Sequence, residues 1–240
     1  MHSPFVFDFI LNVLNNHKNY EAPNDVEELR KELSHNETEI EIEDLGAGSR
    51  LKKTNKKKIK NLATVAVKPK KYGQLLYRLA KHYQPNNIIE LGTSLGVTTT
   101  YFSFSNKNAQ ITTIEGSQSI AQIAKQNFEK LKCNNIQLLQ GNFDDILPSL
   151  LNKTSSIDCI YIDGNHRLEP TLNYFHQSLQ KKHNNTILIF DDIHWSKEME
   201  EAWLTIKEHP EVKCTIDIFF LGFVFFKKEF KEKQHFSIRY

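Results

Sequence analysis

Two short apolar runs of this 240-residue chain are followed by loops that contain aspartate and histidine at the same spacing. The loop Asp163–His166 reads DGNH, and the loop Asp191–His194 reads DDIH. Neighbouring carboxylates repel one another unless a cation or a proton is held between them, and a histidine beside them can accept a proton near neutral pH. The three aspartates are therefore candidate ligands for Mg²⁺, Ca²⁺ or Mn²⁺, and the two histidines are candidate bases. Taken singly, each aspartate is better explained by helix capping or by solvation, and only the three together favour a metal.

A glycine-containing turn follows a third apolar run, Asn87–Leu91, in the sequence ELGTSLG of Glu90–Gly96. Gly92 permits a sharp backbone turn, Gly96 permits close approach of a ligand, and the helix expected next offers unpaired N–H groups. The spacing is ExGxxxG rather than the GxGxxG of dinucleotide sites. An acid directly before such a turn suits a ligand that carries an ammonium group, although the turn alone could be purely structural.

A second glycine sequence, EDLGAGS at Glu43–Ser49, competes with this turn by its letters. Its surroundings do not fit, because the preceding segment alternates charge with isoleucine whereas a buried parallel strand is continuously apolar. A run of lysines follows it instead of an apolar helix. We interpret this segment as a loop or lid.

Polar residues also follow two further apolar runs. Glu115 ends the run that begins at Ile111, 23 residues beyond Gly92, and it is placed to accept both hydroxyls of a ribose. Asn142 and Phe143 follow the run 136–140, where an amide could reach an adenine edge and a ring could pack on it. A helix-capping acid and a simple turn are the plain alternatives.

The polar residues that follow these apolar runs can meet at one edge of a sheet only if strands and helices alternate along the chain. Five apolar strands are expected at 87–91, 111–115, 136–140, 157–162 and 186–191, and helices at 72–83, 96–105, 117–132, 143–152, 168–182 and 196–208. Such alternation predicts a parallel sheet with right-handed crossovers. The last two strands, 213–219 and 222–227, are joined too tightly for a crossover and form an antiparallel hairpin.

The expected fold is an α/β Rossmann-like three-layer sandwich with a mostly parallel seven-stranded sheet that ends in this hairpin. Residues 1–70 are expected to be an N-terminal helical extension with a charged, lid-like segment, and residues 71–240 the ligand-binding domain. An amphipathic helix is predicted at 4–16. Residues 21–44 carry ten acids and residues 50–71 ten basic residues, so the two segments compensate one another.

Composition excludes several classes of protein. The net charge is +2, and no aromatic residues are interleaved among the lysines, so no nucleic-acid partner is expected. The three cysteines lack metal-type spacing. The longest apolar run, Phe219–Phe226, is far shorter than a membrane span, and the N-terminus does not resemble a signal peptide. A cytoplasmic protein without membrane contact is expected.

With these motifs in place, residues 72–228 resemble class I S-adenosylmethionine-dependent methyltransferases. Within that class the IDG-x-H sequence at Ile162–His166 is similar to the bacterial small-molecule O-methyltransferases, and more distantly to metal-dependent catechol and caffeoyl-CoA O-methyltransferases. The residues predicted to bind the cofactor are Glu90, Gly92, Thr93, Ser94, Gly96, Glu115, Gly116, Ser117, Asn142, Phe143 and Asp163. The resemblance implies that the glycine turn surrounds the methionyl part, Glu115 the ribose, and Asn142 and Phe143 the adenine.

The resemblance also implies roles on the acceptor side. Asp163, Asp191 and Asp192 occupy the places of the Mg²⁺ ligands of catechol-type enzymes, with aspartate at 192 where asparagine is usual. His166 stands where those enzymes keep a catalytic lysine, so His166 and Asp163 are the predicted catalytic residues, and Mg²⁺ or another divalent cation is the predicted metal.

The expected activity is therefore methyl transfer from S-adenosylmethionine to an oxygen, or less readily a nitrogen, of a small molecule. A non-catalytic protein that binds S-adenosylmethionine or a nucleotide and keeps the fold is the alternative. A homodimer through the N-terminal helix or through the strand at 219–226 is one interpretation of these apolar segments.

Overall fold

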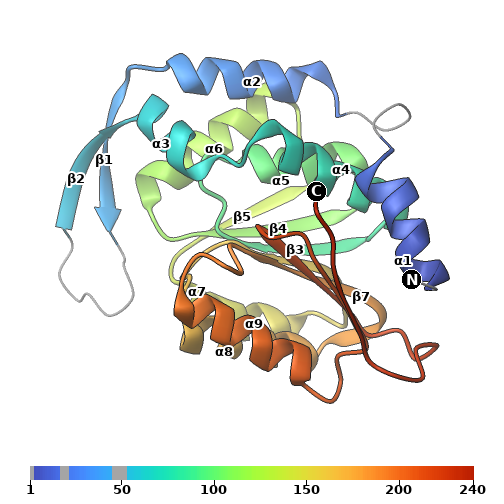
Figure 1. The fold of residues 1–240 in the computed structure, drawn as a ribbon. Helices are drawn as coiled ribbons and strands as arrows, with labels where there is room; N and C mark the ends of the chain where they lie inside the picture. Colours follow the sequence, from blue (N-terminus) through green and yellow to red (C-terminus); the bar gives the residue numbers. More distant parts are fainter. Residues whose placement is uncertain (1–2, 17–21, 45–52) are drawn as a thin grey trace. The chain divides into compact units, whose positions relative to one another are not determined.

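The computed structural model describes residues 3–16, 22–44 and 53–240 (Figure 1). These residues form two compact units. Unit 1 comprises Met1–Asn86 and Thr93–Phe143, and unit 2 comprises Asn87–Gly92 and Asp144–Tyr240. The expected boundary at residues 70 and 71, between the N-terminal extension and the ligand-binding domain, stays a prediction. The two units are defined by contacts within the fold and do not test which residues bind a ligand. The competing glycines at 46–49 lie outside the described residues.

The N-terminal segment of unit 1 forms helix α1 (Pro4–Phe9), continued by one π-helical stretch, η1 (Ile10–Leu14). Proline at the first helical position suits the start of α1, because it has no N–H to leave unpaired. Buried Arg78 on helix α4 (Lys70–Tyr83) donates from Nε to the Val13 carbonyl over 2.7 Å. This bond supplies a partner for one of the carbonyls that the helix end leaves open.

Helices α2 (Asn24–His35) and α3 (Ile59–Ala66) were not predicted, because charged residues dominate the sequence around them. Each nevertheless carries a narrow apolar stripe. Val26, Leu29 and Leu33 of α2 join Ile59 of α3 in a buried cluster that also includes residues of α4 and of α5 (Val97–Ser105). Apolar burial therefore holds these charged helices on unit 1.

Strands β1 (Glu39–Asp44) and β2 (Lys53–Lys58) form an antiparallel hairpin at one side of unit 1 (Figure 1). Glu39 stands opposite Lys58, and Glu41 opposite Lys56. Cross-strand pairs of opposite charge stabilise a sheet modestly, which accounts for the reversal of charge along the sequence. Of the segment Glu43–Ser49, interpreted as a loop or lid, the structure describes Glu43 and Asp44, which end β1, and the interpretation of residues 45–49 stays a prediction.

The remaining strands of unit 1 are β4 (Gln110–Glu115) and β5 (Ile136–Gln140), which pair in parallel. Helix α6 (Gln118–Lys130) connects them in sequence. Both strands and the helix were predicted, within two residues at each end. Because the strands are parallel, their carboxyl ends lie at one edge, and this places Glu115 beside Gln140.

Unit 2 contains the other strands of the expected sheet. In spatial order they are β10 (Gln234–Ser237), β8 (Cys214–Asp217), β9 (Leu221–Phe225), β7 (Lys182–Asp191), β6 (Ile157–Ile162) and β3 (Asn87–Leu91). The parallel pairing of β3, β6 and β7 and the antiparallel pairing of β8 with β9 confirm the Rossmann-like prediction. Strand β10 is an addition to the seven expected strands, since its short, mixed sequence carries little strand signal.

Unit 2 also contains three helices: α7 (Phe143–Lys153), whose first residue belongs to unit 1, α8 (Leu168–Leu179) and α9 (Lys197–Glu208). Helices α8 and α9 lie side by side (Figure 1). The side chain of Ser196 accepts from the Met199 N–H and caps α9. None of the helices in the described part of the chain is long and apolar enough to cross a membrane.

Candidate functional site

The turn after β3 is shaped by two residues of unit 1 with positive φ. Ser94 has φ 48° and Gly96 φ 78°. A Cβ atom on Gly96 would stand 2.5 Å from the ring of Phe128, so this position requires glycine for space as well as for conformation. Gly96 ends the turn as the N-cap of α5. The sequence prediction of a sharp turn that leads into a helix is therefore matched by the geometry.

Glu115 connects this turn to the tip of β4. Its carboxylate accepts from the Ser94 N–H over 2.8 Å and from the Ser117 N–H over 2.9 Å. Burial raises the pKa of this carboxyl, and the backbone hydrogen bonds of Ser117, Ser94 and Gly116 offset part of that rise. A carboxylate fixed by backbone donors in this way is rigid, and its free lone pairs suit a ligand with two neighbouring hydroxyls.

The tip of β5 carries the last predicted residues of unit 1. Gly141 has φ 149°, and its N–H donates to the carbonyl of Glu115 over 2.9 Å. Asn142 is exposed and Phe143 is half-buried at the first residue of α7. The backbone just before these two residues is therefore tied to the tip of β4, and their contact with an adenine stays a prediction.

The part of the turn that belongs to unit 2 is packed against the tip of β6. Gly92 has φ 102°, and a Cβ atom there would overlap the backbone oxygen of Asp163. The Asp163 N–H donates to the Leu91 carbonyl over 2.8 Å. Glu90, two residues earlier, is fully buried. The absence of a side chain at position 92 thus allows Asp163 to lie directly against the turn.

Asp163, His166 and Asp191 form a compact group at the ends of β6 and β7. One ligand atom from each lies within 4.8 Å of the others. The His166 Nε2 atom is 3.5 Å from Asp163 Oδ1, and Asp191 is almost completely buried. The structure thus brings together three of the residues predicted for the acceptor side.

Tyr161, which the sequence prediction did not include, contacts this group through Asp163. Its hydroxyl donates to Asp163 Oδ2 over 3.1 Å. Burial raises the pKa of this phenol well above its usual value, and the carboxylates of Asp163, Asp191 and Glu90 raise it further. The phenol therefore stays a donor. Its place inside an apolar strand gave no signal in the sequence beyond strand periodicity.

Asp192 and His194 take other positions. Asp192 adopts a left-handed conformation, with φ 52°, and its N–H donates to the Phe220 carbonyl. It is not part of the three-residue group. His194 Nε2 lies 2.9 Å from Asp217 Oδ2, and its ring stacks on Phe219. The sequence prediction of a metal group with Asp192 stays untested, but the geometry offers His166 in its place.

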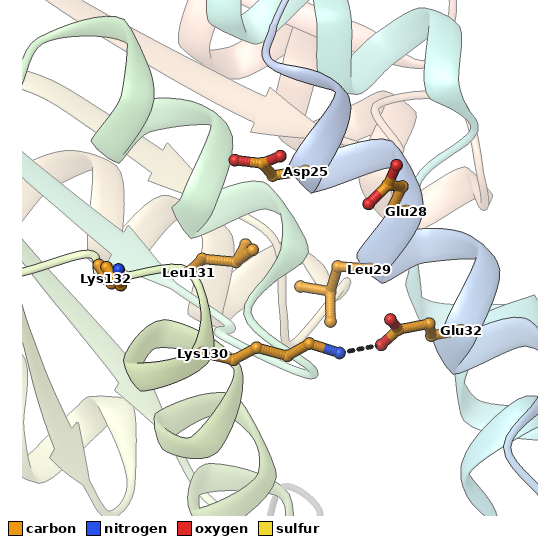
Figure 2. Close-up of a pocket in the computed structure, with 7 residues that line it drawn as sticks. All are labelled: Asp25, Glu28, Leu29, Glu32, Lys130, Leu131 and Lys132. Carbon is orange, nitrogen blue, oxygen red and sulfur yellow. Dashed lines mark hydrogen bonds and ion pairs between the residues drawn. The ribbon is translucent and has the colours of Figure 1, made fainter.

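A pocket in unit 1 is separate from these residues. It has a volume of about 310 Å³ and is lined by Asp25, Glu28, Leu29, Glu32, Lys130, Leu131 and Lys132 (Figure 2). Lys130 pairs with Glu32 across it. Acidic and basic side chains on its walls compensate one another, so its charge favours no particular ligand.

Comparisons with known proteins agree with this arrangement. The sequence model of a family described as "Methyltransferase domain" matches residues 89–193, which include the glycine turn, the loop Asp163–His166 and all but the last residue of the loop Asp191–His194. A curated relative named catechol O-methyltransferase, from Niastella koreensis, is 29% identical over 135 residues. The match covers 55% of this chain, and the chain spans 60% of the length of that relative.

Solved structures share the fold. A methyltransferase from Podospora anserina with bound S-adenosylhomocysteine has a TM-score of 0.68 at 15% identity, covering 95% of this chain and 98% of that one. An O-methyltransferase from Bacillus cereus, also in complex with S-adenosylhomocysteine, has a TM-score of 0.63 at 20% identity, with 92% and 97% covered. Residues 89–193 are thus similar to a methyltransferase domain, and the solved structures show that this chain shares its fold with methyltransferases.

Proposed function

We propose that this protein transfers a methyl group from S-adenosylmethionine to a hydroxyl oxygen of a small molecule. The observation that carries the proposal is the group of Asp163, His166 and Asp191, which lies against the glycine turn through the contact of Gly92 with Asp163. A base and carboxylates at that turn are what deprotonation of a methyl acceptor requires. A protein that only binds the cofactor would not need them.

The cofactor would be held by the residues that the sequence predicts for it. Bound S-adenosylmethionine supplies an activated methyl group on its sulfonium. Thr93, Ser94 and Gly96 offer the turn, and Glu115, with Gly116 and Ser117, accepts the ribose hydroxyls. Asn142 and Phe143 would contact the adenine. Glu90, Gly92 and Asp163 would surround the methionyl part, where buried carboxylates suit an ammonium group.

His166 would take the proton of the acceptor hydroxyl. Asp163 lies 3.5 Å from Nε2 and favours a proton on that nitrogen, so Nδ1 is left as the basic nitrogen. Asp163 would then stabilise the imidazolium that forms, while the Tyr161 hydroxyl holds its other oxygen. The remaining contribution of the protein is to orient the acceptor oxygen in line with the methyl group and to exclude water.

A divalent cation also fits the same three side chains. Two carboxylates and one imidazole suit Mn²⁺ or Zn²⁺, whereas Mg²⁺ prefers oxygen ligands and would take only the aspartates. With a cation present, Asp163 and Asp191 would hold it and His166 would either join them or remain the base. Removal of metal separates these roles: unchanged turnover in chelator would exclude a metal requirement.

A catechol is the acceptor class to test first. The curated relative bears the name of a catechol O-methyltransferase, and a vicinal diol offers one hydroxyl to deprotonate and a second to be held. The acceptor is a small molecule in this proposal, and a cytoplasmic location and a homodimer stay predictions. No observation favours a nucleic-acid partner.

The experiment begins with calorimetric titration of the protein with S-adenosylhomocysteine, followed by turnover of catechol with S-adenosylmethionine. We expect micromolar binding, and binding should weaken as the pH falls through the raised pKa of Glu115, because a protonated carboxyl accepts fewer hydrogen bonds. Glu115→Gln should weaken binding at neutral pH and remove this pH dependence. Absence of binding would reject the proposal, and binding without turnover of any hydroxylated acceptor would support the non-catalytic alternative.

A further inference from the structure

The buried hydroxyl of Tyr174 joins two segments of unit 2 that are distant in sequence. Tyr174 lies on α8 with no exposed surface. Its hydroxyl accepts from Asn165 Nδ2 over 2.7 Å and donates to Asp144 Oδ1, in the first turn of α7, over 2.9 Å. Burial is the main cause that raises the pKa of this phenol, so it keeps its proton and can serve as donor and acceptor at once.

The segment that this hydroxyl holds is the loop that carries His166. Asn165 precedes His166 directly and adopts a left-handed conformation, with φ 59°. Residues other than glycine enter this conformation rarely, and asparagine is among those that do so most readily. The hydrogen bond from the Asn165 side-chain amide to the Tyr174 hydroxyl fixes the side chain of Asn165 in that geometry. The direction in which the backbone enters His166 is therefore determined by a contact made outside the loop.

The position of His166 depends on that direction. Its Nε2 atom lies 3.5 Å from Asp163 Oδ1, at the outer limit of a useful contact, and a small rotation of the loop would separate them. The hydrogen-bonded bridge Asp144–Tyr174–Asn165 ties the middle of the loop to helices α7 and α8. Misplacement of a reacting group by about 1 Å is enough to cost two orders of magnitude in rate.

We propose that Tyr174 is a positioning residue for the methyl-transfer reaction, and that its hydroxyl keeps His166 facing Asp163 by holding Asn165 in the left-handed conformation. The expected effect of Tyr174 on the reaction rate rests on the proposed function. Its expected effect on the conformation of the loop Asp163–His166 does not. Tyr174 itself does not contact the acceptor in this proposal.

Tyr174→Phe tests the hydroxyl alone, because the ring stays in place. We expect kcat for catechol methylation to fall about 10- to 100-fold, with the affinity for S-adenosylhomocysteine changed less than about threefold. Tyr77→Phe is the matched control, since it also removes a buried tyrosine hydroxyl, from the core of unit 1. It should leave kcat unchanged.

Asn165→Gly removes the other end of the bond but keeps a residue that tolerates positive φ. If both groups act through one contact, the double variant with Tyr174→Phe should lose no more activity than the more damaged single variant. Additive losses, or a kcat for Tyr174→Phe within about twofold of wild type, would overturn the proposal.

A spectroscopic measurement keeps the test independent of turnover. In a ¹⁵N-labelled full-length protein, the backbone amide signals of Gly164 and His166 should shift or broaden in Tyr174→Phe and remain unchanged in Tyr77→Phe. Unchanged signals in Tyr174→Phe would reject the positioning role even if activity fell. If the wild type neither binds S-adenosylhomocysteine nor turns over, the proposed function fails, whereas the amide signals still decide whether the bridge holds the loop.

Discussion

The loops after β6 and β7 share the spacing Asp-x-x-His and yet direct their histidines differently. In the first loop, His166 turns back toward its own Asp163, at 3.5 Å. In the second loop, His194 turns away from Asp191 and lies 2.9 Å from Asp217, at the end of β8. Both loops belong to unit 2 and follow adjacent parallel strands.

The left-handed residue accounts for the difference. It is the third residue of the first loop, Asn165, and the second residue of the other, Asp192. Asn165 is held by Tyr174, whereas the N–H of Asp192 is held by the Phe220 carbonyl. Spacing therefore sets which side chains can reach a common point, and contacts from neighbouring elements decide which of them do so. Six variants, in four experiments, test this contrast.

Asp163→Asn should have the largest effect, because it changes a residue that contacts both the glycine turn and His166. We expect kcat/KM for catechol to fall about 10²- to 10⁴-fold, since the neutral amide cannot stabilise a protonated imidazole. Steady-state turnover with the cofactor in excess measures it. A loss of less than tenfold would place the reacting groups elsewhere.

His166→Gln and His194→Gln compare the two loops directly. The first should lower kcat by about 10²-fold, and the second by less than about threefold, because only His166 lies in the group with Asp163 and Asp191. Both should bind S-adenosylhomocysteine as the wild type does, by calorimetry. Equal losses in the two variants would contradict the contrast between the loops.

Asp191→Asn and Asp192→Gly separate the geometry from the sequence prediction of metal ligands. We expect turnover to fall by about 30-fold in Asp191→Asn and to stay within about threefold of wild type in Asp192→Gly, where glycine suits the positive φ. Retention of added Mn²⁺ after dialysis should follow the same order. Loss of turnover in Asp192→Gly would support the sequence prediction that Asp192 is a metal ligand.

Asp217→Ala should affect stability more than activity. Its carboxylate accepts from His194, from the Trp203 indole and from the Phe219 N–H, so its removal leaves three donors without this partner. We expect a loss of about 2 kcal/mol in the free energy of unfolding, measured in urea, with kcat within about threefold of wild type. An unchanged urea midpoint together with a loss of activity would show that the loop Asp191–His194 takes part in the reaction.

Periodicity was enough to predict the strands that end at Leu91, Glu115 and Ile162, because buried parallel strands are continuously apolar. It was not enough for α2, α3 and the β1–β2 hairpin, since there the apolar residues form narrow stripes among many charges. The acids at the strand tips could be predicted from parallel pairing.

The choice of His166 over Asp192 for the three-residue group could not be predicted, because it depends on a backbone conformation. The role proposed for Tyr174 also left no trace in the sequence. Its partner Asp144 lies 30 residues away, and only the packing of α8 brings the two together.

The contact of Gly92 with the backbone of Asp163 has a consequence for redesign. Because the backbone of Asp163 occupies the space that a side chain at position 92 would need, the glycine turn and the loop that begins at Asp163 depend on each other. If the turn or the loop were replaced alone by the sequence of another protein, the contact of position 92 with position 163 would be kept only if the register of β3 and β6 were kept. The segment 192–195 has no such tie to position 92, so a change of substrate range should be sought there first.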